Sequence, residues 1–122
     1  MKDAYVVLVC GARDYARRER VFEVLDIYHG RIGPTMLILT GGARGADTFA
    51  REWAVSRKVD HMVLHAKWEL YGKSAGPIRN RRMAKRKPRL VLAFHSNIDA
   101  SKGTADMIGI AKDRDIKHKV FK

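Results

Sequence analysis

The sequence is poor in cysteine and in long apolar runs, and each shortage excludes a class of protein. Its single cysteine, Cys10, forms no internal disulfide, which excludes a disulfide-stapled fold and suits a reducing compartment. Because Cys10 ends an apolar run, we interpret it as a small buried hydrophobe rather than a nucleophile. No stretch approaches the roughly 20 consecutive apolar residues of a membrane span, so we expect no membrane partner.

The five histidines have no cysteine partners, and we therefore expect neither a metal site nor a bound cofactor. The chain begins Met1-Lys2-Asp3 and passes directly into an apolar run. This start lacks the features of a secretory signal, so we expect a cytoplasmic location.

Acidic residues are also scarce, with 13 Asp and Glu against 25 Lys and Arg, which gives a formal net charge of +12. Such an excess attracts polyanions but does not choose among nucleic acid, nucleotides and an acidic partner. One segment, Arg79 to Arg89, holds much of it as Arg79, Arg81, Arg82, Lys85, Arg86, Lys87 and Arg89. This segment is either a nucleic-acid contact, with Trp68 and Tyr71 nearby, or a solvated helix face.

Apolar runs alternate with segments of helical period along the chain. Residues 4–9, 36–39, 60–65, 90–94 and 116–121 predict strands, and residues 17–29, 46–57, 76–86 and 105–114 predict helices. This order predicts an α/β protein: a three-layer Rossmann-like fold with a mostly parallel five-stranded sheet, in one domain over residues 1–122. Residues 66–75 have no clear period and suggest a long loop or a short helical turn, and the lysines of 116–121 suggest an edge strand.

A glycine-rich turn, Thr40-Gly41-Gly42-Ala43-Arg44-Gly45-Ala46-Asp47, lies between the second predicted strand and its helix. Glycine permits close backbone approach, and a helix start offers unpaired N–H groups to an anion, so this turn is a candidate phosphate seat. It is neither a Walker loop nor a G-x-G-x-x-G fingerprint. The alternative is a tight turn whose glycines only reverse the chain.

The other unusual polar residues also follow predicted strands. Ligands of open parallel sheets bind beyond the carboxyl ends of the strands, so we expect these loops to form one ligand site. The candidate residues are Gly11, Arg13, Asp14, Gly41, Gly42, Arg44, Gly45, Asp47, Trp68, Gly76, Arg79, Asn80, Gly103 and Thr104.

Two roles are open for several of these residues. Arg44 suits a forked contact with phosphate. Asp47 either accepts from ribose hydroxyls or caps its own turn, and Arg44 beside it should lower its pKa. Trp68 either stacks on a base or packs in the core. Arg13 and Asp14 either pair with each other or hold Arg44 in place.

The later candidates lie at two further helix starts. Gly76 permits close approach, and Arg79 and Asn80 in the same first turn suit an anion and an amide-edge contact, unless Arg79 is only a surface charge. Gly103 and Thr104 offer an N-terminus with a hydroxyl cap, whose role is either ligand binding or simple capping.

Five ordered motifs carry a family resemblance. They are Val-Cys-Gly-Ala-Arg-Asp-Tyr at 9–15, Gly-Gly-Ala-Arg-Gly-Ala-Asp at 41–47 followed by Trp53-Ala54, Trp68 with Tyr71-Gly72, Ala-Gly-Pro-Ile-Arg-Asn at 75–80 with Met83, and Gly-Thr-Ala-Asp-Met at 103–107. Together they resemble the small YspA-like, YpsA-related branch of the SLOG superfamily. The resemblance implies a Rossmann-like fold that senses or processes nucleotide-derived ligands such as ADP-ribose or NAD derivatives.

The resemblance leaves three functions open: a nucleotide-binding sensor or sequestering module, a nucleoside monophosphate phosphoribohydrolase, and a single-stranded nucleic-acid binder. Hydrolytic relatives carry a glutamate three residues after the threonine of the Gly-Thr motif, and here that position is Met107. Asp106 should point some 100° away around the helix and would substitute poorly. Self-association into a homo-oligomer is also left open.

Overall fold

Five parallel strands form the centre of the molecule, which is known here from a computed structural model that describes residues 3–97 and 101–122. Met1 and Lys2, which should lead into the first strand, and residues 98–100 lie outside the described part. The strands are β1 (Tyr5–Gly11), β2 (Met36–Thr40), β3 (Asp60–Val63), β4 (Leu90–Phe94) and β5 (Lys117–Phe121). Their order is β3-β2-β1-β4-β5, and every strand pair is parallel.

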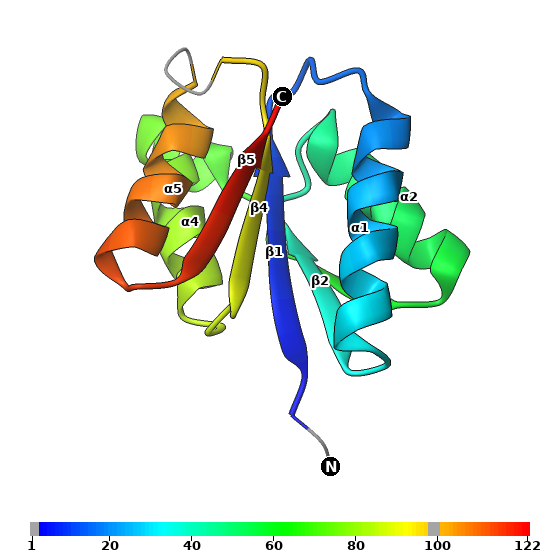
Figure 1. Ribbon diagram of the computed structural model, residues 1–122. Helices are drawn as coiled ribbons and strands as arrows, with labels where there is room; N and C mark the ends of the chain where they lie inside the picture. The colour runs from blue at the N-terminus through cyan, green and yellow to red at the C-terminus, as the bar shows by residue number, and fades with distance from the viewer. Residues whose placement is uncertain (1–2, 98–100) are drawn as a thin grey trace.

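Helices cover both faces of this sheet (Figure 1). They are α1 (Arg18–Ile32), α2 (Ala46–Arg57), α3 (Trp68–Tyr71), the 3-10 turn η1 (Gly72–Ser74), α4 (Ala75–Ala84) and α5 (Lys102–Asp113). Helices α1 and α2 pack together, as do α4 and α5, and Figure 1 places the two pairs on opposite sides of the sheet. The predicted three-layer Rossmann-like α/β fold is confirmed.

The alternation of side chains along β1 divides the core in two. Val7 and Val9 are fully buried against the α1 and α2 layer, where Trp53 is the largest buried side chain. Leu8 points to the other face, where it packs with Met83 and other residues of the α4 and α5 layer. Strands buried on both faces read as continuous apolar runs, which is why β1 and β4 were predictable from sequence.

The strand order reverses between β1 and β4. The chain passes from β1 to β2 and β3 on one side, and then crosses β1 to continue with β4 and β5. In open parallel sheets such a reversal favours a ligand site beyond the carboxyl ends of the strands, and these ends lie at the top of Figure 1. Among the residues that the structure describes, no helix is long and apolar enough to cross a membrane.

The main departures from the predicted elements lie between β3 and β4. The segment interpreted as a loop or a short helical turn contains α3 and η1, and α4 starts at Ala75, directly after η1. The amide of Ala75 donates to the carbonyl of Gly72, so the helical hydrogen bonding continues across this boundary. Gly76 is therefore inside a helical stretch and does not open a helix with free N–H groups, as its place in the sequence suggests.

Candidate functional site

A cleft of about 820 Å³ opens at the carboxyl ends of the strands. The loops that follow β1, β2, β3 and β4 each contribute to its walls, together with α3, α4 and the start of α5. The lining includes every residue predicted for the site except Gly45: Gly11, Arg13, Asp14, Gly41, Gly42, Arg44, Asp47, Trp68, Gly76, Arg79, Asn80, Gly103 and Thr104. The structure thus brings together residues that are far apart in sequence.

Gly45 supports the cleft from outside its lining. Its φ is +76°, and a Cβ at this position would collide with the carbonyl oxygen of Ala12. The neighbouring Ala46 amide faces that same carbonyl oxygen at 3.5 Å. Gly45 therefore lets the start of α2 approach the loop after β1.

Asp47 organises the glycine-rich turn from within. Its Oδ2 atom accepts hydrogen bonds from the amides of Gly41, at 3.0 Å, and Ala43, at 3.1 Å. The side chain is buried, and its carboxylate already occupies two of the amides that the turn could otherwise offer to a phosphate. The capping interpretation of Asp47 thus describes its observed contacts. No described residue accepts a hydrogen bond from the amides of Gly42 and Arg44.

The pKa of Asp47 is raised to about 6, because burial of the carboxyl outweighs the hydrogen bonds and charges that favour ionisation. The cations that partly offset burial are Arg79 and Arg13. The expectation that Arg44 would lower this pKa is wrong, since desolvation is the larger effect. Asp47 is therefore a carboxyl group that changes protonation just below neutral pH.

Arg79 and Asn80 link three elements across the cleft floor. Arg79 donates from Nη1 to the carbonyl of Gly41, at 2.7 Å, and from Nε to Oδ1 of Asn80, at 3.1 Å. Asn80 in turn donates from Nδ2 to the carbonyl of Gly103 and to Oδ2 of Asp106, at 3.2 and 2.9 Å. The glycine-rich turn, α4 and α5 are thus joined by one hydrogen-bonded chain, and Arg79 is more than a surface charge.

Trp68 lies at the rim and is 48% exposed. The guanidinium of Arg13 lies over the ring, 5.7 Å from its centroid. The alternative that Trp68 packs in the core is therefore wrong. Among the described residues Arg13 forms no ion pair with Asp14, so the rim pairing suggested by sequence is replaced by a cation–π contact.

The start of α5 is capped by a residue that the sequence did not single out. Ser101 Oγ accepts from the amide of Thr104 at 3.3 Å, whereas the Thr104 side chain is buried in the third helical position. The prediction that Thr104 supplies the hydroxyl cap is wrong. The helix begins at Lys102, before the first of its apolar residues, so the cap is Ser101.

The residues that α5 directs toward the cleft also differ from those that the family motif suggests. Met107 is buried in the core with the α4 and α5 layer, while Asp106 lines the cleft. Positions 106 and 107 point in different directions, as expected, but it is Asp106 and not Met107 that faces the cleft. Gly103 and Asp106 are three residues apart and share the face toward the cleft, whereas Met107 lies on the face packed in the core.

Sequence reasoning missed other residues of the cleft. They are Cys10, Ala12, Ala43, Ala66, Lys73, Pro77, Met83, Ser101, Lys102 and Asp106, whereas His65 and His95 line the cleft as their places at the ends of predicted strands suggest. Lys73 and Lys102 are exposed cations at this rim. Lys73 lies in η1 and Lys102 begins α5, and both helical segments start before the apolar residues that predicted a helix. Burial raises the pKa of the Cys10 thiol, with Asp47 adding to the effect, which agrees with its interpretation as a non-nucleophile.

Comparison with known proteins relates this chain to a protein family, to a phage protein and to a solved structure. The family model described as "YspA, cpYpsA-related SLOG family" matches residues 5–71. The Gene 61 protein of Mycobacterium phage D29 is 36% identical over 93 residues, which cover 72% of this chain and 74% of that protein.

The solved structure of DNA processing protein A (DprA) from Streptococcus pneumoniae matches with a TM-score of 0.60 and 16% identity. The match covers 97% of this chain and 59% of that one, so this chain spans under two thirds of the length of the solved protein. At this identity the likeness concerns the fold alone.

Proposed function

The chain belongs to the YspA, cpYpsA-related SLOG family, and from this premise we propose that its cleft binds a nucleotide or a nucleotide-derived ligand as a sensor or sequestering module. The ligand class is that of ADP-ribose, NAD derivatives or nucleoside monophosphates. The observation that carries this proposal is that cations from separate segments of the chain surround one cleft together with the exposed Trp68. They are Arg13, Arg44, Lys73 and Lys102. A cationic rim beside an aromatic face suits a molecule that has both phosphate and base.

The contacts already made inside the cleft divide its cations into two kinds. Arg79 is committed to the Gly41 carbonyl and to Asn80, so its role is to hold the turn. Arg44 is exposed, and its own amide and that of Gly42 are without protein acceptors among the described residues. We therefore assign the phosphate to the Gly42 to Arg44 side of the cleft and the base to Trp68.

Isothermal titration with ADP-ribose, NAD, nucleoside monophosphates and cyclic nucleotides tests this proposal. Binding of at least one of them is expected, and Arg44→Ala should weaken it about tenfold or more, since a charge-assisted hydrogen bond contributes roughly 1.5–3 kcal/mol. Arg51→Ala is the matched control, because Arg51 is an exposed arginine on α2 outside the cleft lining. The absence of binding to every compound would overturn the proposal.

A second candidate function is hydrolysis of the N-glycosidic bond of a nucleoside monophosphate. The observation that favours it is the cleft carboxyl of Asp47 with a pKa of about 6, which suits general acid or base chemistry near neutral pH. Asp106 supplies a second carboxylate in the same cleft. AMP incubated with the protein should then release free adenine, detected by chromatography, and Asp47→Asn should abolish the release. If no adenine appears above the blank, this second candidate function is overturned.

A further inference from the structure

The segment between Glu69 and Asp99 contains no acidic residue at all. Its cations are Lys73, Arg79, Arg81, Arg82, Lys85, Arg86, Lys87 and Arg89. In the structure this run is split between two ends of the molecule. Lys73 and Arg79 line the cleft, whereas the other cations lie farther along α4 and in the turn that leads to β4.

The turn after α4 lies at the end of the sheet opposite the cleft. Parallel strands begin at that end, and the amide of Arg89 donates to the carbonyl of Val6 near the start of β1. Helix α4 has ten residues, about 15 Å of length, between the cleft and this turn. We call Arg81, Arg82, Lys85, Arg86, Lys87 and Arg89 the α4 basic surface, and all six are exposed.

The molecule leaves the charge of this surface uncompensated. The ion pairs among the described residues are Arg18–Glu52, Arg20–Glu23 and Arg57–Asp26, all on α1 and α2. Cations in a last helical turn stabilise the helix dipole, and Arg81 and Arg82 have that position. Lys85 is the C-cap residue and shares this favourable position, but Arg86, Lys87 and Arg89 follow the helix, so the dipole does not account for the whole cluster.

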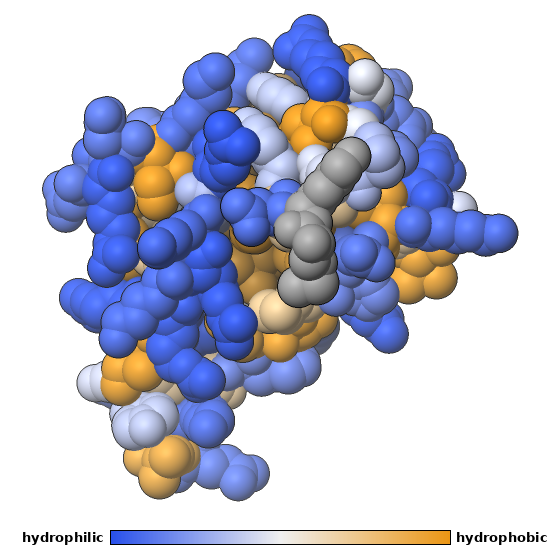
Figure 2. All heavy atoms as spheres, turned by 90° about the horizontal axis from the view of Figure 1, so that it is seen from below, coloured by the Kyte–Doolittle hydropathy of each residue, from blue (hydrophilic) through white to orange (hydrophobic). Residues whose placement is uncertain are grey.

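We propose that the α4 basic surface binds the phosphate backbone of nucleic acid, separately from the cleft. Arg81 and Lys85 are one helical turn apart, about 6 Å along the axis, which lets successive cations reach successive phosphates. Met83 and Leu90, the large apolar residues between Arg81 and Leu90, are buried, so the α4 basic surface itself has nothing to insert into a lipid bilayer. Seen from this end, the molecule is covered mainly by hydrophilic side chains (Figure 2).

The structure also changes the kind of binding that the sequence suggested. Trp68 and Tyr71 belong to α3 at the cleft end of α4, so they do not lie beside Lys85 to Arg89. The ring of Tyr5 lies under the guanidinium of Arg89, 4.6 Å from its centroid, and is partly buried against the core, so it offers unpaired bases a poor stacking platform. Binding therefore depends on the charge of the phosphate backbone of the nucleic acid. A duplex should bind at least as well as a single strand because its charge density is higher.

Fluorescence anisotropy with labelled oligonucleotides of about 20 nucleotides or base pairs, at several salt concentrations, tests this proposal. The expected result is binding without sequence preference and with a Kd of about 1–100 μM that weakens steeply as salt rises. Replacing Lys85, Arg86 and Lys87 by glutamine should weaken binding about tenfold or more and reduce the slope against salt by about one per lost contact.

Matched variants separate this surface from net charge and from the cleft. Glutamine at Arg31, Arg51 and Lys58 removes the same charge from exposed sites elsewhere and should have a much smaller effect. Arg44→Ala in the cleft should leave the affinity unchanged. Equal losses in the two triple variants, loss with Arg44→Ala, binding independent of salt, or binding only to anionic lipid vesicles would each overturn the proposal. If the first triple variant fails to fold, Arg86→Gln alone should still reduce the salt slope.

Discussion

Two properties of Asp47 have opposite effects on the stability of the fold. Its carboxylate holds the glycine-rich turn through the amides of Gly41 and Ala43, but its burial makes the charged form costly. A neutral amide at this position could accept the same two hydrogen bonds without carrying a charge. The choice of aspartate thus costs stability near neutral pH, which is a common property of functional sites.

This conflict predicts a measurable dependence of stability on pH. The pKa of Asp47 is about 6 in the fold against an ordinary value of 3.8 for an aspartate in water, so the folded state binds the proton more tightly. The contribution of Asp47 is therefore fully present below about pH 4 and is lost as the pH rises through about 6, by roughly 3 kcal/mol at most. Asp47→Asn removes this dependence.

Urea unfolding of the two proteins from about pH 4 to about pH 7 measures the effect. The free energy of unfolding of the wild type, relative to Asp47→Asn, should fall across this range. Parallel curves for the two proteins would mean that Asp47 titrates normally in the fold.

Sequence reasoning found most cleft residues because they follow apolar strands of clear length. It failed where side-chain direction depends on the helix phase, as at Asp106 and Met107, and where burial competes with charge, as at Asp47. The exposure of Trp68 was equally beyond sequence, because an indole suits both a core and a ligand site. The structure was therefore needed to assign a role to each cleft residue, whereas the sequence alone placed many of these residues at the cleft.

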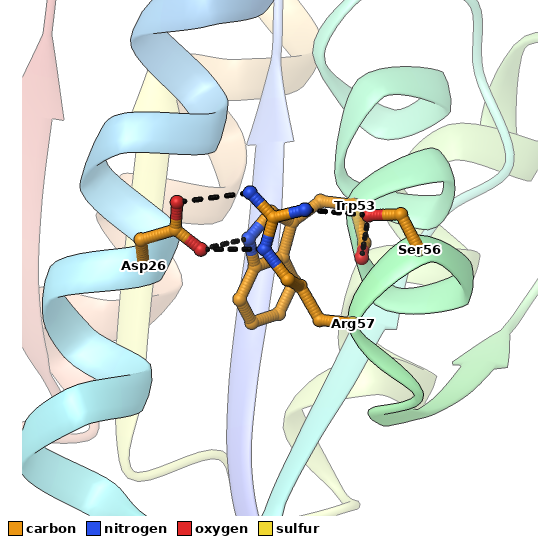
Figure 3. A network of polar contacts seen from close by, with 4 residues as sticks. All are labelled: Asp26, Trp53, Ser56 and Arg57. Carbon is orange, nitrogen blue, oxygen red and sulfur yellow. Dashed lines mark hydrogen bonds and ion pairs between the residues drawn. The ribbon is translucent and has the colours of Figure 1, made fainter.

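At the scale of elements, one polar network fastens α1 to α2 (Figure 3). Asp26 of α1 accepts from Trp53 Nε1 at 2.8 Å and from Arg57 Nε at 2.9 Å, both through Oδ1. The hydrogen bonds from Arg57 and Trp53 lower the pKa of Asp26, with that of Arg57 the larger effect. The network thus persists at neutral pH and weakens only as the pH falls below about 4.

Removing the shared acceptor should loosen this pair of helices. In Asp26→Ala the fully buried Trp53 loses the partner of its indole N–H, so we expect a loss of about 1–3 kcal/mol in the free energy of unfolding. Asp26→Asn keeps an acceptor oxygen and should lose less. Glu52→Ala is the control, because its ion pair with Arg18 is half-exposed and should contribute within about 0.5 kcal/mol.

Urea denaturation of the three variants makes the comparison. A loss in Asp26→Ala no larger than that in Glu52→Ala would contradict the role assigned to the buried indole. Both α1 and α2 were predictable from their apolar period, but this contact between them was not, because Asp26 and Arg57 read as ordinary surface charges.

At the scale of the whole molecule, the ion pairs are unevenly distributed over the two helical layers. The net charge is +12, and the ion pairs found in the described part of the chain lie on α1 and α2. The opposite layer carries the α4 basic surface without such pairs. Repulsion among these cations should oppose folding, and it should be strongest when little salt screens it.

We therefore expect the melting temperature to rise with sodium chloride. Between about 20 mM and about 200 mM the screening length falls from roughly 20 Å to under 10 Å, which covers the spacing of charges along α4, and the rise should be about 2 °C or more. With glutamine at Lys85, Arg86 and Lys87, the melting temperature should start higher and rise less. The wild-type rise should persist in Arg44→Ala, which separates screening from anion binding in the cleft. A melting temperature that is flat or falls with salt would mean that the unpaired cations do not strain the fold.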